Sequence, residues 1–154
     1  MKFLIQSKML LKIKQILTLF IVILCISITF PSASLAEEEA YFAGGCFWCL
    51  EHDFEDVKGV LSVESGYSGG EKINPTYEDH QGYQEAISIK YDPQIISYEE
   101  LLRVYWRNID PLDDQGQFCD KGNSYKAKIF TVDIEQETMA QMSKKNAAKE
   151  LNDL

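Results

Sequence analysis

Gly44-Gly45-Cys46-Phe47-Trp48-Cys49 is the stretch that decides the fold, and it also contains the first candidate for chemistry. The two glycines allow a sharp turn of the backbone immediately before a cysteine. Residues 39–43 before the turn predict a short strand, and residues 46–57 predict a helix. A thiol at such a strand-to-helix turn lies where free N–H groups and the positive end of the helix dipole favour a thiolate. We therefore interpret Cys46 as a nucleophile.

Residues 1–36 have the pattern of a secretory signal peptide. An apolar run at 16–30 and a cleavage site at Ser34-Leu35-Ala36 follow a basic segment that contains Lys2, Lys8, Lys12 and Lys14. The alternative is an uncleaved membrane anchor, although the apolar run is short for a membrane span and a cleavage site follows it. We expect export to the periplasm, a mature domain at 37–154, and no stable membrane insertion after cleavage.

The charge of this domain limits its partners. The chain has 15 basic and 24 acidic residues. Four of the basic residues and none of the acidic ones precede residue 37, so the remainder has 11 basic against 24 acidic side chains, a formal charge of −13. Such a charge argues against a nucleic-acid partner. The composition is otherwise that of one ordinary soluble domain with enough apolar residues for a core.

The order of the expected elements indicates the fold class. Further strands are expected at 59–66, at 85–91, where apolar and polar residues alternate, and at 127–132. Further helices are expected after a capping box of Ser97 and Glu100, and from 135 to the end of the chain. This order predicts an α+β fold, a ferredoxin-like two-layer α/β sandwich. Two long loops, at 67–82 and 112–124, are expected to carry function.

Three cysteines follow the signal segment, namely Cys46, Cys49 and Cys119. An odd number in an exported protein indicates at least one functional thiol. Half of a zinc site is one interpretation, but a second pair of closely spaced ligands is missing from the sequence, so we expect neither a metal nor a cofactor. A thioredoxin-like dithiol is the second interpretation. The third is a single nucleophile, Cys46, with Phe47 and Trp48 as an apolar wall around a substrate.

The two loops contribute further candidates. Tyr67 could be a turn aromatic, Asp79 a solvated charge, and Tyr125 a ring that packs at the start of a strand. Together they would place one carboxyl group and two phenols beside a thiol. That set suits a reaction in which sulfur attacks and an oxygen atom receives protons.

These residues together resemble the A-type peptide-methionine sulfoxide reductases. The similarity begins with the run from Gly44 to Glu51 and extends over about residues 40–132. It continues, in order, through Gly66-Tyr67-Ser68-Gly69-Gly70, Asn74-Pro75-Thr76-Tyr77, Tyr91-Asp92-Pro93, Asp110-Pro111, Gly116-Gln117-Phe118 and Asp120-x-Gly122-x-x-Tyr125.

The resemblance implies an enzyme that reduces methionine S-sulfoxide in proteins and peptides, and free methionine sulfoxide, to methionine. Cys46 would be the nucleophile, and Phe47 and Trp48 would surround the S-methyl group of the substrate. Asp79 falls where the family places an acid, often Glu, that protonates the sulfoxide oxygen. Glu78 is the weaker alternative for this acid.

The resemblance also implies supporting roles and partners. Tyr67 and Tyr125 would bind the sulfoxide oxygen, and Asp120 would support the site. Cys49 is the first choice for the thiol that resolves the sulfenic acid on Cys46, and Cys119 is its rival. A thioredoxin-like dithiol would reduce the resulting disulfide. We expect the protein to be a monomer.

The sequence departs from the family in two places. The usual Gly-His-x-Glu appears as Gly82-Tyr83-Gln84-Glu85. The chain also ends within its last helix, where family members usually continue, so we expect the family's C-terminal segment to be missing. An exported Cys-x-x-Cys exchange protein and an inactive, truncated reductase remain as alternative functions.

Overall fold

The computed structural model describes residues 14–15 and 37–152. The predicted signal segment at 1–36 therefore lies, except for residues 14–15, outside the described residues, and the signal peptide stays a prediction. Within the described ranges, none of the helices combines the length and the apolar character needed to cross a membrane.

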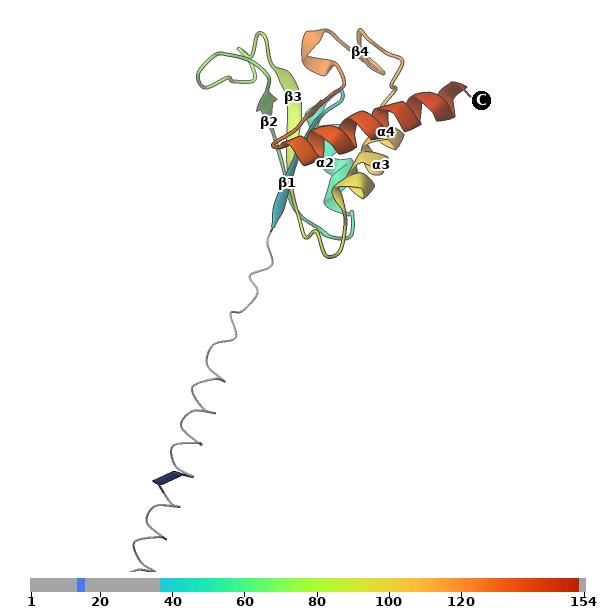
Figure 1. The fold of residues 1–154 in the computed structure, drawn as a ribbon. Helices are drawn as coiled ribbons and strands as arrows, with labels where there is room; N and C mark the ends of the chain where they lie inside the picture. Colours follow the sequence, from blue (N-terminus) through green and yellow to red (C-terminus); the bar gives the residue numbers. More distant parts are fainter. Residues whose placement is uncertain (1–13, 16–36, 153–154) are drawn as a thin grey trace, which may run out of the picture. The chain divides into compact units, whose positions relative to one another are not determined.

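An antiparallel sheet forms the centre of the domain (Figure 1). Its strands, in the spatial order β2-β3-β1-β6, are β2 (Val60–Ser68), β3 (Gln84–Tyr91), β1 (Glu38–Ala43) and β6 (Lys128–Phe130). β1 pairs with both β3 and β6, and β2 pairs with β3, all antiparallel. Together with one helix after β1 and another after β3, this order confirms the ferredoxin-like prediction.

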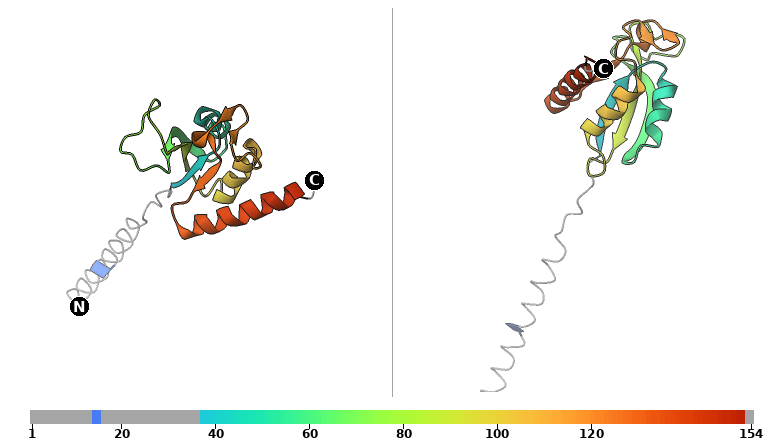
Figure 2. Two further views of the ribbon diagram at one scale, coloured as in Figure 1. Left: turned by 90° about the horizontal axis from the view of Figure 1, so that it is seen from above. Right: turned by 90° about the vertical axis from the view of Figure 1, so that its right-hand side faces the viewer.

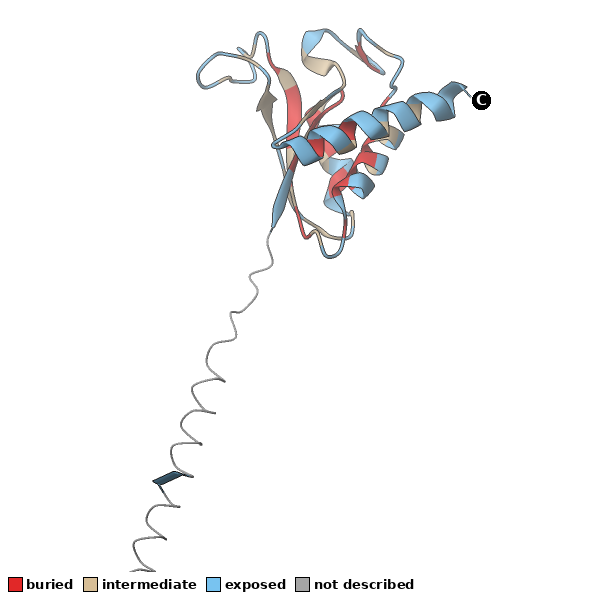
Figure 3. Cartoon of the chain, viewed as in Figure 1, coloured by how far each residue is buried: buried red, intermediate tan, exposed pale blue. Residues whose placement is uncertain are grey.

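The alternation of apolar and polar side chains along the strands decides which face of the sheet the helices cover. Phe42 on β1 is the register partner of Ile87 on β3, and both are fully buried. Helices α2 (Phe47–Glu55) and α3 (Tyr98–Asn108) pack on this face, because the Phe42 ring contacts Phe54 of α2 and Tyr105 of α3. The result is a two-layer sandwich, and Figure 3 shows its buried residues gathered where the sheet meets these helices.

The last helix, α4 (Ile134–Asn152), packs against α3. Figure 2 shows α4 running along one side of the domain next to α3. Trp106 of α3 donates a hydrogen bond from Nε1 to the Ser143 hydroxyl of α4, at 3.0 Å. Most of α4 is exposed, and only Gln136 and Ala140 are buried (Figure 3).

The predicted loop at 112–124 is more ordered than expected. It contains a hairpin of β4 (Gly116–Gln117) and β5 (Asp120–Lys121), followed by the short helix η1 (Asn123–Tyr125). Gln117 is fully buried, and its side chain bonds to both the N–H and the carbonyl of Asp110. Strands of two residues are too short to show an alternating pattern, and the side-chain bonds of Gln117 to Asp110 leave no pattern either, so the sequence does not predict the order of this loop.

Candidate functional site

The glycine pair brings the Cys46 turn close to the hairpin. Gly45 has a φ of +94°, and a Cβ atom there would lie 2.9 Å from Cβ of Gln117. Its N–H donates to the carbonyl of Tyr125 at 3.1 Å. Cys46 follows as the N-cap residue of α2, half-buried, and its carbonyl accepts the N–H groups of Cys49 and Leu50. The predicted thiol at a helix N-terminus is therefore present.

Gly45→Ala is expected to lower the free energy of unfolding by about 1–3 kcal/mol, because a left-handed φ and a close neighbour both oppose a side chain there. Urea unfolding measures the change. Gly66→Ala is the matched control, since a Cβ at Gly66 meets nothing within 4 Å and no positive φ is present. A loss at Gly45 no larger than at Gly66 would contradict the close packing of this turn.

Glu85 is the carboxyl group that contacts the Cys46 turn. It lies at the start of β3, is 2% exposed, and its Oε2 accepts the N–H of Phe47 at 3.1 Å. Burial raises the pKa of Glu85 above its ordinary value, and the Phe47 N–H and the nearby His80 offset only part of that rise. A carboxyl group with a raised pKa beside a thiol can act as a proton donor.

Asp79, the predicted acid, is placed differently. Its carboxylate is exposed and pairs with Lys72. Its backbone forms an isolated antiparallel β-bridge with Thr76, in which each N–H donates to the carbonyl of the other residue. Glu78 is also exposed. The prediction that Asp79 lies beside the thiol is therefore wrong for this structure, in which the buried carboxyl group at the Cys46 turn is that of Glu85.

The sequence carried a signal that pointed to Glu85. Residues 85, 87, 89 and 91 share one face of β3, and the last three are buried apolar or aromatic side chains. A carboxyl group that continues such a buried stripe needs a special partner, since buried charges are rare without one. Here that partner is the N–H of Phe47 at the start of α2.

The two predicted phenols lie around Glu85. Tyr67 is its register partner on β2, since that strand extends two residues further than expected. The Tyr67 hydroxyl is buried and has no hydrogen-bond partner within residues 37–152. Tyr125 lies on η1, and the pKa of its phenol is raised chiefly by the charge of Glu85, with smaller effects of burial, Asp120 and Cys46. Both phenols therefore stay protonated donors at neutral pH.

Asp120 on β5 lies close enough to the site to act electrostatically on several of its groups. It raises the pKa of Glu85, Tyr125 and Cys49, in each case as a minor cause after the larger effects of burial or of another charged group. The structure thus brings four predicted residues, Cys46, Tyr67, Tyr125 and Asp120, to the surroundings of Glu85.

Aromatic rings form the wall of the site beside the thiol. Phe47 is buried against Tyr67, with ring centroids 5.6 Å apart. Trp48 is 58% exposed and stacks on Tyr77, which is 54% exposed, with centroids 5.7 Å apart and planes at 18°. An exposed pair of stacked rings next to a thiol offers an apolar surface for a small alkyl group.

His80, for which the sequence indicated no role, also belongs to this wall. Its ring stacks on Tyr67 at 4.8 Å and 20°, and its Nδ1 lies 3.1 Å from the carbonyl oxygen of Thr76. Because that oxygen can only accept, Nδ1 carries a proton. Tyr83, which stands where the resembled family has His, is buried, and its hydroxyl donates a hydrogen bond to the Lys72 carbonyl. Both residues fix the loop that borders the site.

The three cysteines of the described domain are free thiols. Cys49 lies one helical turn after Cys46, and its N–H donates to the Cys46 carbonyl at 3.0 Å. Partial burial, together with this thiol neighbour, raises the pKa of Cys49. Cys119 occupies the exposed tip of the β4–β5 hairpin. Cys49 is thus the cysteine whose backbone is bonded to that of Cys46.

The arrangement favours sulfur chemistry over metal binding. A thiol at a helix start, a buried carboxyl group with a raised pKa and two phenols converge beside an aromatic wall. Over the part of the chain that the structure describes, the His, Cys, Asp and Glu side chains form no group of three that could hold a metal ion.

Comparison with known proteins gives one consistent result. Residues 38–153 match the family described as peptide methionine sulfoxide reductase. The peptide methionine sulfoxide reductase MsrA 2 of Caulobacter vibrioides is 52% identical over 118 residues, which are 74% of this chain and 60% of that protein. The MsrA of Ligilactobacillus salivarius is 49% identical over 119 residues, 75% of this chain and 69% of that protein.

Solved structures agree with these sequence matches. Methionine sulfoxide reductase A of Corynebacterium diphtheriae superposes with a TM-score of 0.73 at 27% identity, over 78% of this chain and 60% of that one. Reduced Mxr1 of Saccharomyces cerevisiae, at 24% identity and a TM-score of 0.67, shares the fold over 77% of this chain and 72% of that one. The chain thus spans about 60% of the length of the Caulobacter and Corynebacterium proteins.

Proposed function

Because the chain belongs to the peptide methionine sulfoxide reductase family, we propose that it reduces methionine sulfoxide in oxidised proteins and peptides, and free methionine sulfoxide, to methionine. The observation that carries the proposal is the contact between Glu85 and the Cys46 turn, through the N–H of Phe47. It brings a proton donor to a nucleophile. By resemblance the substrate is the S epimer at sulfur, and the role is repair of oxidised proteins.

In the first step, the Cys46 thiolate attacks the sulfoxide sulfur while Glu85 gives its proton to the sulfoxide oxygen. The oxygen transfers to Cys46, whose sulfur is oxidised to a sulfenic acid as the substrate sulfur is reduced to a thioether. In this proposal, Tyr67 and Tyr125 donate hydrogen bonds to the same oxygen. The hydroxyl of Tyr67, buried without a partner among the described residues, supports this role.

In the second step, the thiol of Cys49 attacks the sulfenic sulfur of Cys46. A disulfide forms between them and water leaves, so no external oxidant is needed. An external dithiol then reduces the disulfide and is itself oxidised. The position of Cys49 in the first turn of α2, one helical turn after Cys46, supports Cys49 over Cys119 for this step. We propose a thioredoxin-like protein as the external dithiol, and a monomeric enzyme.

Turnover with the two epimers of a methionine sulfoxide peptide tests the activity itself. The purified chain, supplied with a thioredoxin system, is expected to reduce the S epimer and to leave the R epimer unchanged. Insulin reduction in the absence of sulfoxide serves as the comparison, because a simple disulfide-exchange protein would perform it readily. Insulin reduction without reduction of the S epimer would overturn the proposal.

Cys49→Ser is expected to allow one turnover and to abolish the following ones, because the sulfenic acid on Cys46 loses its resolving thiol. Rapid-quench measurement of methionine should show a burst of one equivalent for each enzyme, followed by a steady rate lowered about 10²-fold or more. Cys119→Ser is the matched control and should keep the steady rate. The reverse pattern would assign resolution to Cys119.

We also propose that the domain is exported to the periplasm. The basic start, the apolar run at 16–30 and the cleavage site at 34–36 support this, and residue 37 would begin the mature chain. Sequencing of the N-terminus of the chain recovered from a cell envelope would test it. A mature N-terminus at Met1 would contradict cleavage and favour an anchor.

A further inference from the structure

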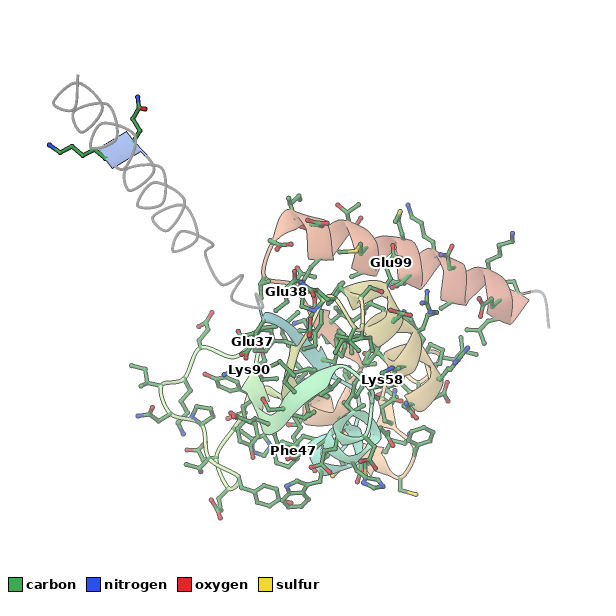
Figure 4. The ribbon with its side chains drawn as sticks, turned by 90° about the horizontal axis from the view of Figure 1, so that it is seen from below. Glu37, Glu38, Phe47, Lys58, Lys90 and Glu99 are labelled. Atoms are coloured by element: carbon green, nitrogen blue, oxygen red, sulfur yellow. The ribbon has the colours of Figure 1, made fainter. Side chains whose placement is uncertain are left out.

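A groove of about 600 Å³ lies between α3, β6 and α4. Its lining comes from the end of α3, from the segment 127–131 that contains β6, and from α4. It includes none of the residues placed around Cys46 and Glu85. Figure 4 shows α4, in pale red, on one side of the domain and Phe47, the neighbour of Cys46, on the opposite side in that view. The groove is therefore separate from the proposed reductase site.

One free edge of the sheet borders this groove. β6 is the last strand of the sheet and pairs with β1 only, so the edge that faces away from β1 has no strand partner among the described residues. Residues 127–129 and Thr131 line the groove, whereas none of the residues of β1 is among its lining. The N–H and C=O groups of an antiparallel strand point alternately to its two sides, so an unpaired edge presents some of them. The groove therefore offers backbone hydrogen bonds to a further strand.

Apolar side chains make up much of the remaining lining. Ile109 and Leu112 follow α3, and Ala140 and Leu151 belong to α4. Leu112 is 75% exposed and Leu151 is 36% exposed, although both are large apolar residues. Apolar side chains that gather around an open groove mark an interaction surface, unlike single exposed leucines. The side chains of an added strand that face α3 and α4 would therefore be apolar.

The charge of the groove is opposite to that of the domain. Three charged side chains line it, namely Lys128, Lys144 and Glu137. Both lysines are exposed, and neither takes part in the ion pairs of the described domain, although Lys128 lies 4.9 Å from the centroid of the Phe130 ring. Glu137 accepts a hydrogen bond from the Gln141 amide at 3.2 Å. Two lysines without a carboxylate partner favour an acidic ligand at this place.

The free edge of β6 decides between two kinds of acidic, apolar ligand. The alkyl chain of a fatty-acid carboxylate would cover the unpaired backbone groups without bonding to them, which is costly for buried polar groups. An extended polypeptide would pair with the same groups, as in recognition by strand addition. Alternate side chains of such a strand point to opposite faces. One set would lie beside Ile129, in the groove, and the other beside Lys128.

We propose that this groove binds an extended, acidic polypeptide segment, which adds a strand to the free edge of β6. Its apolar side chains lie in the groove against α3 and α4, and its carboxylates alternate with them and face Lys128. Lys144, on the α4 side of the groove, adds to the attraction. Binding does not involve Cys46 or Glu85, so it can be measured independently of the reductase activity.

The test is an NMR titration of the full chain with its isoleucine amides labelled. The probe is an acetylated and amidated peptide of about seven residues, enough to cover β6, in which valine alternates with glutamate. In one control peptide lysine replaces glutamate, and in the other every backbone nitrogen is methylated, which removes the N–H donors and keeps the side chains. The probe is expected to shift the Ile129 amide signal saturably, and both controls to bind at least about tenfold more weakly. Decanoate tests for an alkyl carboxylate site.

Variants then locate the site. Lys128→Gln combined with Lys144→Gln is expected to weaken binding of the probe about three- to tenfold, because two exposed charge contacts are lost. Lys145→Gln combined with Lys149→Gln is the matched control, since it removes the same charge from exposed positions of α4 that do not line the groove. It should change binding less than about twofold. Urea unfolding of each variant shows whether it is folded.

Four results would overturn the proposal. The first is no saturable shift of the Ile129 signal with the probe up to about 5 mM, a concentration at which weak sites fill. The second is equal binding of either control peptide, which would exclude strand pairing or recognition of acidic side chains. The third is saturable binding of decanoate without binding of the probe. The fourth is an equal loss of affinity in both lysine pairs, which would indicate attraction by net charge. The wild-type titration decides the first three even if a variant fails to fold.

Discussion

Cys46→Ser is expected to lower turnover of methionine S-sulfoxide by roughly 10⁴-fold or more, because a serine hydroxyl at this position cannot take the oxygen and form a sulfenic acid. The substitution replaces sulfur by oxygen at a half-buried N-cap position, where serine is a favoured residue. The variant should therefore fold normally. Steady-state turnover with each epimer, together with urea unfolding, separates lost chemistry from lost structure.

The Cys49→Ser variant is the control for this test. It makes the same replacement of sulfur by oxygen one helical turn further along α2, and it should still release one equivalent of methionine, whereas Cys46→Ser should release none. If Cys46→Ser retained a burst of methionine, the nucleophile would be a different residue. If both variants unfolded at lower urea concentration, the result would concern stability.

Glu85→Gln is the second large effect, with turnover expected to fall about 10²- to 10⁴-fold because the sulfoxide oxygen loses its proton donor. The Gln side chain can still accept the N–H of Phe47, so the turn should keep its position. Asp79→Asn is the matched control, and the exposed site of Asp79 predicts a change of less than about twofold. Equal losses in both variants would contradict the assignment of the acid to Glu85.

The pH dependence follows from the direction of the Glu85 shift. Since its pKa is raised, the protonated donor persists to a higher pH than for an exposed Glu, and turnover should fall as pH rises through that value. The same shift means that ionisation of Glu85 opposes folding, so Glu85 favours the folded state at low pH and that contribution is lost as pH rises through the folded pKa. Glu85→Gln should remove both dependences.

The stability of Glu85→Gln therefore tests whether ionisation of Glu85 opposes folding. At a pH above the pKa of Glu85, the wild-type chain buries a carboxylate, whereas the variant buries a neutral amide of similar shape. Urea unfolding at high pH is expected to show the variant at least as stable as the wild type. A variant that is much less stable at every pH would mean that Glu85 mainly supports the structure.

The alternation of apolar and polar residues, together with the turn and capping residues, predicts the fold well. The run of apolar residues at 87, 89 and 91 and the capping box at Ser97 are local signals, and the strands and helices that they predict are present. The hairpin at 116–121 is not predicted, because its two-residue strands are too short to alternate and Gln117 is joined to Asp110 through its side chain. Contacts of that kind leave no periodic pattern in a sequence.

The candidate site also combines features that local sequence signals predict with features that depend on contacts between distant residues. Cys46 and its aromatic neighbours were found because a glycine pair and a helix start lie together in the sequence. The resemblance to the family implies Asp79, on the long loop, as the acid. Only the pairing of β2 with β3, which places Tyr67 opposite Glu85, reveals which carboxyl group is buried beside the turn. Such pairing joins residues far apart in sequence.

The most direct measurement is mass spectrometry of the Cys49→Ser chain after one equivalent of each sulfoxide epimer, with a reagent that traps sulfenic acids. The site predicts that the S epimer adds one oxygen atom to Cys46 and releases one equivalent of methionine, and that the R epimer does neither. Methionine released while Cys46 stays unmodified, or oxygen found on Cys119, would contradict oxygen transfer to the thiol at the start of α2.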